Sequence, residues 1–254
     1  MSKFSLAGKT AVITGGAGGL GRAMVAAYAE AGANVVVASR DHEKIDAAAA
    51  DVRDKGQNAI AIPVDITDAE QVDNLVAKTV EEFGSLDIIV NNAGRWGNSY
   101  LAENTPLDEW RNIVDQNLTG VFIPCMAAGR QMIKQRSGKI INISSTAGSK
   151  GNPHQLHYSA AKAGVISLTN NLAYMWAKHN INVNCILPGL IATLATLRAG
   201  SGDITLDEFI KIMMRPHPPD PVPDWEESEL IALFESMDVD GELSAMMLEI
   251  AHVL

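Results

Sequence analysis

Residues 9–21 read Lys9-Thr10-Ala11-Val12-Ile13-Thr14-Gly15-Gly16-Ala17-Gly18-Gly19-Leu20-Gly21. The consecutive apolar and β-branched residues at 10–13 predict a short buried strand, and residues 22–28 predict a helix after the glycines. Glycines let the backbone approach a pyrophosphate, while a helix N-terminus offers free N–H groups and the positive end of its dipole. The stretch therefore favours a dinucleotide-binding loop over a merely tight strand–helix turn. The loop residues expected to bind are Gly15, Gly19, Leu20 and Gly21.

Strands and helices alternate along the chain that follows. Alternation of this kind predicts an α/β fold, in which a parallel sheet is covered by helices on both faces. We therefore expect a single domain with a Rossmann-type, doubly wound parallel sheet. The expected strands are 34–39, 59–64, 86–90, 139–143 and 181–187, and the expected helices are 41–55, 68–83, 105–135 and 155–180.

Polar residues and glycines gather where the expected strands end. Ligands of open parallel sheets bind beyond the carboxyl ends of the strands, so these positions predict one shared site. The residues at these ends are Gly15, Arg40, Asp65, Asn91, Ser145 and Pro188.

The tip of the second strand bears on the choice between NAD(H) and NADP(H). An NAD site usually has Asp or Glu here to hold the ribose 2′-hydroxyl. This chain has Ser39 and Arg40, a hydroxyl and a guanidinium that suit a 2′-phosphate. Asp41 follows and could bind a ribose hydroxyl after a small shift. NADP(H) is therefore favoured and NAD(H) stays possible.

Tyr158 and Lys162 are four residues apart, so both side chains are expected on one face of a helix. An ammonium beside a phenol stabilises the phenolate, and we expect it to lower the pKa of Tyr158 and ease proton exchange. Asn117 lies on the apolar side of the expected helix 105–135, where a buried asparagine bonded to the backbone is the simpler interpretation.

Composition limits the class of protein. The 254 residues are 47% hydrophobic and 20% charged, which is typical of a globular chain, and contain no apolar run long enough for a transmembrane helix. The N-terminus does not resemble a signal peptide, and two cysteines suit a reducing cytosol, so we expect a cytoplasmic protein. The net charge of −10 argues against nucleic acid as a partner.

The sequence resembles the short-chain dehydrogenase/reductase family over residues 1 to about 198. Residues 14–21 match its coenzyme motif, residues 91–94 match its central Asn-Asn-Ala-Gly motif, and residues 188–193 match the segment that holds the nicotinamide amide. The family's catalytic tetrad is matched in order and spacing by Asn117, Ser145, Tyr158 and Lys162.

The resemblance implies an NAD(P)(H)-dependent oxidoreductase that transfers a hydride between the nicotinamide and a secondary alcohol or ketone. Tyr158 would be the general acid or base, Lys162 would lower its pKa and bind the nicotinamide ribose, Ser145 would bind the substrate oxygen, and Asn117 would anchor a proton-relaying water. No metal ligand is implied, and a homotetramer or homodimer is expected. The implied cofactor contacts also include Asp65, Ile66, Asn91, Ala93, Gly94, Pro188, Gly189, Ile191 and Thr193.

The substrate residues follow less directly. Arg95 and Trp96 come after the central motif, and His154 and Gln155 precede the tyrosine, so all four should border the substrate. His157 is expected to point elsewhere on the helix and to be structural.

The last part of the chain departs from the family. Residues 1–198 are predicted to form the dinucleotide-binding and catalytic core, and residues 199–254 an acidic substrate lid and C-terminal segment of the same domain. This segment resembles degenerate EF-hand loops, but Leu243 stands where a calcium loop needs glycine, so a calcium-responsive tail is disfavoured. A non-catalytic dinucleotide sensor is the other alternative, and the complete tetrad argues against it.

Overall fold

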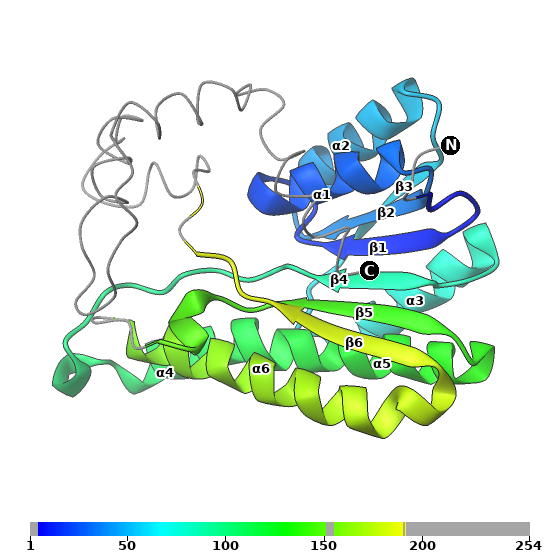
Figure 1. Ribbon diagram of the computed structural model, residues 1–254. Coiled ribbons are helices and arrows are strands. Elements are labelled where there is room, and N and C mark those ends of the chain that lie inside the picture. Colours follow the sequence, from blue (N-terminus) through cyan, green and yellow to red (C-terminus); the bar gives the residue numbers. More distant parts are fainter. Residues whose placement is uncertain (1–4, 151–154, 190, 192–254) are drawn as a thin grey trace, which may run out of the picture. The chain divides into compact units, whose positions relative to one another are not determined.

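In the part of the chain that the structure describes, six parallel strands form one sheet in the order β3-β2-β1-β4-β5-β6. The computed structural model describes residues 5–150, 155–189 and 191 (Figure 1). The strands are β1 (Thr10–Thr14), β2 (Asn34–Ser39), β3 (Ala59–Pro63), β4 (Ile88–Asn91), β5 (Gly138–Ile143) and β6 (Ile181–Ile186). The helices are α1 (Gly19–Glu30), α2 (His42–Asp54), α3 (Ala69–Phe83), α4 (Leu107–Val114), α5 (Gly120–Gln135) and α6 (Leu156–Trp176).

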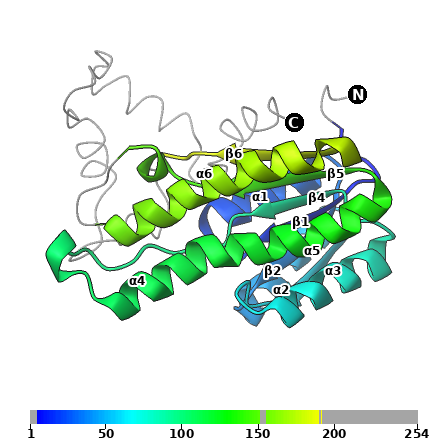
Figure 2. The same cartoon turned by 90° about the horizontal axis from the view of Figure 1, so that it is seen from below.

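Helices cover both faces of the sheet. Helices α1 and α2 pack on one face, and α3, α5 and α6 pack on the other (Figures 1 and 2). The central strands are buried from end to end, as β1 illustrates with all five of its residues. This arrangement confirms the predicted doubly wound parallel α/β fold. The strand order reverses between β1 and β4, which is where such sheets bind ligands.

Helix α3 shows how local sequence sets the element boundaries. The Asp68 side chain caps its start by accepting hydrogen bonds from the N–H groups of Glu70 and Gln71. Gly84 ends it in a left-handed conformation with φ of 80°. Its apolar stripe is buried against the sheet, as its helical spacing predicts.

The prediction of one continuous α-helix over residues 105–135 is wrong in its start and in its regularity. Helix α4 begins at Leu107, and residues Asp115–Thr119 form a π-helical turn before α5 starts at Gly120. A π turn widens the helix by one residue, and such turns are frequent at functional sites. The expected helix 155–180 is also shorter, because α6 ends at Trp176 and a 3₁₀ turn follows over Ala177–His179.

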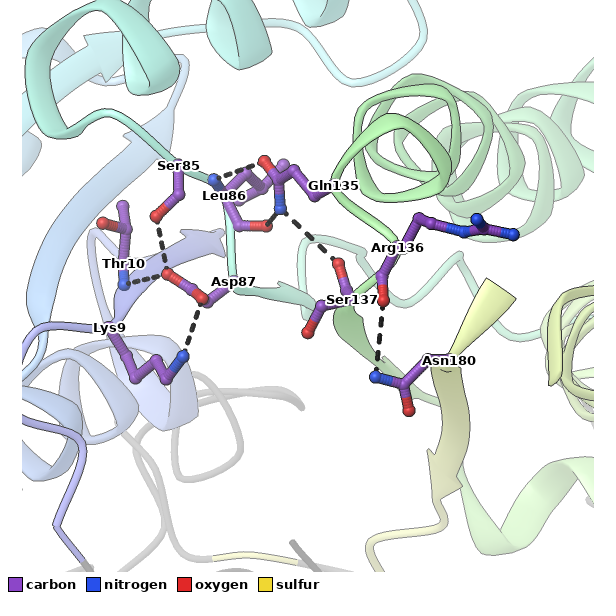
Figure 3. A network of polar contacts seen from close by, with 9 residues as sticks. All are labelled: Lys9, Thr10, Ser85, Leu86, Asp87, Gln135, Arg136, Ser137 and Asn180. Atoms are coloured by element: carbon purple, nitrogen blue, oxygen red, sulfur yellow. Dashed lines mark hydrogen bonds and ion pairs between the residues drawn. The ribbon is translucent and has the colours of Figure 1, made fainter. Parts of the chain in front are cut away.

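A polar network closes the amino-end edge of the sheet (Figure 3). Asp87, just before β4, accepts hydrogen bonds from the Thr10 N–H at 3.0 Å, the Ser85 hydroxyl at 2.8 Å and Lys9 Nζ at 3.1 Å. The Gln135 side chain bonds both backbone groups of Leu86. These contacts tie β1, β4 and the end of α5 together.

The fold belongs to the unit Met1–Gly189, and a second unit comprises Leu190–Leu254. The boundary predicted at residue 198, the acidic segment 199–254 and its degenerate EF-hand loops lie outside the described residues. Among the helices that the structure describes, none combines the length and apolar character needed to cross a bilayer.

Candidate active site

The loop between β1 and α1 has the geometry that a pyrophosphate requires. Gly15 and Gly19 have positive φ values of 67° and 53°, and a methyl group at Gly21 would collide with the carbonyl oxygen of Gly15. Gly18 precedes α1 and provides no side-chain cap, so the first N–H groups of the helix are not used by a capping side chain. The open helix terminus and the closely packed glycines fit a dinucleotide phosphate, with Leu20 in the first turn of α1.

At the tip of β2, two oppositely charged side chains are placed differently. Asp41 caps α2, because its carboxylate accepts from the N–H of Lys44 at 3.2 Å and from Lys44 Nζ at 2.6 Å. The hydrogen bonds from Lys44 lower the pKa of Asp41. Arg40 lies at the surface, 64% exposed, with Nη1 3.9 Å from Asp65 Oδ2. The Arg40 guanidinium thus has one long ion pair, whereas the Asp41 carboxylate is engaged by Lys44. Ser39 accepts a hydrogen bond from the N–H of Asp41 at 3.2 Å.

Asp65 and Ile66 follow β3. The hydrogen bonds that Asp65 accepts from the backbone and hydroxyl of Thr67 lower its pKa. Ile66 lies against the start of α5, where a methyl group on Gly120 would be 2.7 Å from its Cδ1. Both residues are therefore fixed beside the ends of the neighbouring strands.

The end of β4 is anchored to β1. Thr14 Oγ1 accepts from the N–H groups of Asn92 and Ala93 at 3.0 and 3.1 Å. The Asn91 side chain turns into the core instead, where it donates to Asn142 Oδ1 at 2.9 Å. Only the backbone of Asn91 is therefore placed toward the predicted cofactor side. Gly94 faces two of the predicted catalytic residues, since a methyl group there would lie 2.7 Å from Asn117 Oδ1 and 3.5 Å from Lys162 Nζ.

Asn117 lies in the π turn and is fully buried. Its Nδ2 donates to the carbonyl oxygens of Arg95 at 2.8 Å and Ile113 at 3.0 Å, and its Oδ1 accepts from the Arg95 N–H at 3.3 Å. Asn117 thus forms hydrogen bonds with backbone groups, as the simpler interpretation predicts, and these bonds also hold the segment after β4 in place. The close approach to Gly94 places it beside Lys162.

The two serines after β5 have different partners. Ser144 is buried and donates to the carbonyl oxygen of Lys162 at 2.8 Å, which supports a structural role. The Ser145 hydroxyl accepts from the N–H of Ala147 at 3.2 Å and hydrogen-bonds the Tyr158 side chain. Beyond β6, the carbonyl oxygen of Pro188 accepts from Thr146, and Gly189 is exposed. Ile191 is half-buried, and the predicted contact Thr193 lies outside the described residues.

Tyr158 and Lys162 share one face of α6, as their spacing predicts. Lys162 Nζ lies 5.6 Å from the centre of the Tyr158 ring and donates to the carbonyl oxygen of Ile143 at 2.9 Å. Burial lowers the pKa of Lys162 from 10.5 to about 8.

The expected lowering of the Tyr158 pKa is wrong for this structure. Burial raises the pKa of the phenol, and the hydrogen bond with Ser145 offsets only part of the rise. The physical reason is geometric, because the ammonium lies over the ring and bonds a backbone carbonyl. Tyr158 is therefore held in its protonated form at neutral pH.

Three of the four predicted substrate residues are described by the structure, and each has different surroundings. The Trp96 ring stacks on Tyr158, with ring centres 6.1 Å apart and an interplanar angle of 30°. Arg95 is exposed, and its backbone bonds Asn117. Gln155 is the buried residue that precedes α6, with Oε1 lacking a partner among the described residues, and His154 lies outside them.

His157, expected to be structural, has contacts that agree with this expectation and that lie next to Tyr158. It is buried, its Nδ1 accepts from the N–H of Tyr158 at 2.8 Å, and its ring meets Tyr100 edge-on. The available signal was its position in the first turn of the helix, where backbone N–H groups need acceptors.

The matched family supplies the biochemical context. The family described as "short chain dehydrogenase" matches residues 9–202. The chain belongs to this family. Family membership makes it an oxidoreductase and confirms the resemblance seen in the sequence.

Individual relatives agree with this assignment. A 3-oxoacyl-[acyl-carrier-protein] reductase of Synechocystis sp. is 41% identical over 190 residues, which are 74% of this chain and 76% of that protein. A crystal structure of NAD⁺-bound xylitol dehydrogenase has a TM-score of 0.71 at 37% identity, covering 74% of this chain and 72% of that one. A putative short-chain alcohol dehydrogenase from Sinorhizobium meliloti has a TM-score of 0.76 at 34% identity, covering 91% and 90%.

Proposed function

We propose that the protein reduces a ketone to a secondary alcohol with NADPH, with Tyr158 as the general acid. The observation that carries this proposal is the placement of the Tyr158 phenol, which hydrogen-bonds the Ser145 side chain and shares one face of α6 with Lys162. A phenol carries its proton at neutral pH, so Tyr158 can serve as the general acid that reduction of a ketone requires. The relative from Synechocystis, named as a reductase of 3-oxoacyl groups, supports the same direction.

The bound dinucleotide would supply the hydride, and the protein would supply orientation and proton transfer. The glycine loop would hold the pyrophosphate, while the residues after β3, β4 and β6 would hold the remainder. Ser145 would donate to the carbonyl oxygen, and Tyr158 would pass its proton to the same oxygen. Lys162, with a pKa of about 8, can exchange a proton near neutral pH beside Asn117.

The preference for NADP(H) rests on the tip of β2. The Arg40 guanidinium is exposed and only loosely paired, so it is available to a 2′-phosphate. Asp41, the residue that could have held a ribose hydroxyl, already caps α2 and binds Lys44. A structural relative binds NAD⁺, so the fold alone does not fix the cofactor, and the preference for NADP(H) rests on Arg40.

A homo-oligomer, a tetramer or a dimer, is part of the proposal. The helices α5 and α6 leave large apolar side chains exposed, among them Phe122, Tyr174 and Met175. A second copy of the chain would cover them, since exposed apolar patches of this kind mark interfaces. A monomeric mass in light scattering at micromolar concentration would contradict this.

The test is a coupled assay that follows nicotinamide absorbance. Linear, cyclic and aromatic ketones, a 3-oxoacyl thioester and the matching alcohols are each offered with NADPH and with NADH. Turnover of a ketone with NADPH, faster than with NADH, is the expected result. Cofactor binding without turnover of any compound would instead favour the non-catalytic sensor.

A further inference from the structure

A buried imidazole supports the backbone of the proposed general acid. His157 is 1% exposed, and its Nδ1 accepts a hydrogen bond from the N–H of Tyr158 at 2.8 Å. This N–H lies in the first turn of α6, where no intrahelical acceptor exists, and Gln155 before the helix offers no side-chain cap. His157 therefore takes the place of a helix cap at the residue that carries the reactive phenol.

The second nitrogen of the same ring faces the segment after β4. Because Nδ1 accepts, the neutral ring carries its proton on Nε2. Nε2 is buried and has no hydrogen-bond partner among the residues that the structure describes. A methyl group at Gly97 would lie only 2.5 Å from it, and the Tyr100 ring stands edge-on, with ring centres 6.3 Å apart. Buried donors are normally paired, so a position like this one calls for an explanation.

The segment 96–100 also reaches Tyr158 directly. Trp96, next to Gly97, stacks its indole on the Tyr158 ring. One imidazole thus touches the backbone of Tyr158 through one nitrogen and the segment carrying Trp96 through the other. A shift of the ring would change the spacing between the phenol and the indole.

We propose that His157 is a positioning residue that fixes the Tyr158 phenol against the Trp96 indole and so sets how the carbonyl substrate fits between them. This rests on the proposed function, in which Tyr158 is the acid. His157 does not touch the reacting atoms. Its effect should therefore appear in the kinetic parameters of the carbonyl compound, and the dinucleotide, whose proposed contacts lie at the strand ends, should bind as before.

Two substitutions at His157 separate its hydrogen bond from its volume. His157→Phe keeps a ring but removes the acceptor, whereas His157→Asn keeps an acceptor oxygen close to the position of Nδ1. We expect His157→Phe to lower kcat/KM for the most active ketone of the screen by about tenfold, the change that corresponds to one lost hydrogen bond. We expect His157→Asn to keep kcat/KM within about threefold, because the Tyr158 N–H retains its partner. The Kd for NADPH should stay within about twofold in both variants, since neither touches the glycine loop or Arg40.

A third variant approaches the ring from its other side. Gly97→Ala places a methyl group against His157 Nε2 and, at 2.8 Å, against Cγ1 of Ile113, without changing α6. It should raise the KM for the ketone and leave the Kd for NADPH unchanged. If His157→Phe does not fold, His157→Asn and Gly97→Ala carry the test. Wild-type KM in Gly97→Ala would then overturn the proposal.

The remaining outcomes are decisive in the same way. Equal losses in His157→Phe and His157→Asn would show that the acceptor is irrelevant, and a matching loss of NADPH affinity would show a general structural role. Either result overturns the proposal. Tyr158→Phe, measured in parallel, separates it from the proposed function. If Tyr158→Phe is inactive while His157→Phe is normal, only the positioning role fails; if Tyr158→Phe is active, the proposed function fails.

Discussion

Two charged side chains at opposite edges of the sheet have different partners: Asp87 at the amino-end edge is surrounded by hydrogen-bond donors, whereas Lys162 at the carboxyl-end edge is buried without a counter-ion among the described residues. At the amino-end edge, Asp87 receives three donors, and burial raises its pKa by less than these hydrogen bonds lower it (Figure 3). At the carboxyl-end edge, Lys162 is buried with a neutral carbonyl as its hydrogen-bond acceptor, and no ion pair joins it to a carboxylate among the described residues. Within the described part of the chain, His157 Nε2 at the same edge also lacks a hydrogen-bond partner.

The difference between Asp87 and Lys162 separates polar groups that stabilise the fold from polar groups that are available for chemistry. A buried charge without a counter-ion destabilises the folded state, so its presence at a strand end indicates a site. A fully paired carboxylate indicates structure.

The largest effect is expected from Lys162→Met. Removing the ammonium should lower turnover by at least about 10²-fold, because the proton exchange beside Tyr158 is lost. The coupled assay with NADPH measures this, and melting temperature serves as the control for folding. Turnover near that of the unchanged protein would mean that the carboxyl-end lysine is structural after all.

The same residue should give stability a characteristic pH dependence. Burial lowers the pKa of Lys162 to about 8, against 10.5 in the unfolded chain. Below pH 8 both states are protonated and the burial of the charge destabilises the fold fully. Between pH 8 and 10.5 the unfolded state holds more protons, so stability rises with pH.

Urea unfolding of the unchanged protein and of Lys162→Met, from pH 7 to 10.5, checks this. As the pH rises, the free energy of unfolding of the unchanged protein should increase relative to that of the variant by at most roughly 3 kcal/mol, since each pKa unit corresponds to about 1.4 kcal/mol. A constant difference across this range would show that the lysine is not a buried cation.

Arg40→Ala should weaken NADPH by about 1.5–3 kcal/mol, the range for a charged hydrogen bond, and should barely change the affinity for NADH. The measurement is a titration with each cofactor. Arg130→Ala is the matched control, because Arg130 is also an exposed arginine paired with an aspartate, Asp73, but on α5. Equal effects of Arg40→Ala on both cofactors would contradict a contact with the 2′-phosphate.

Asp87→Asn should leave the kcat of folded protein unchanged but lower the free energy of unfolding by about 1–3 kcal/mol, because an NH2 group replaces one acceptor oxygen and the negative charge is lost. The stabilisation belongs to the carboxylate, whose pKa lies below 3.8, so it is present above pH 3.8 and is lost as the pH falls through the lowered value. The exposed Asp73→Asn is the control and should change stability by at most about 1 kcal/mol. A loss of kcat in Asp87→Asn would erase the distinction between the two edges.

Much of this architecture is readable from the sequence. Buried parallel strands appear as consecutive apolar runs such as residues 10–13, and the turns after them carry the site, so strand ends alone gather Gly15, Arg40, Asp65 and Ser145. The one-face placement of Tyr158 and Lys162 follows from helical spacing and is confirmed.

Other features depend on three-dimensional surroundings. The π turn at Asn117 adds one residue to a turn, which apolar periodicity does not register. The pKa of Tyr158 depends on burial and on where Lys162 Nζ points, and spacing gives neither. The His157 ring bonds the N–H of the next residue, although its side chain is on another face from Tyr158 by spacing alone.

The most direct test of the central claim is the turnover of Tyr158→Phe with NADPH, measured together with its Kd for NADPH. This substitution removes only the phenolic oxygen. Proton donation at the carboxyl-end edge predicts turnover lower by at least about 10²-fold with the Kd for NADPH unchanged. Turnover within a few-fold of the unchanged protein would contradict the assignment of Tyr158 as the general acid.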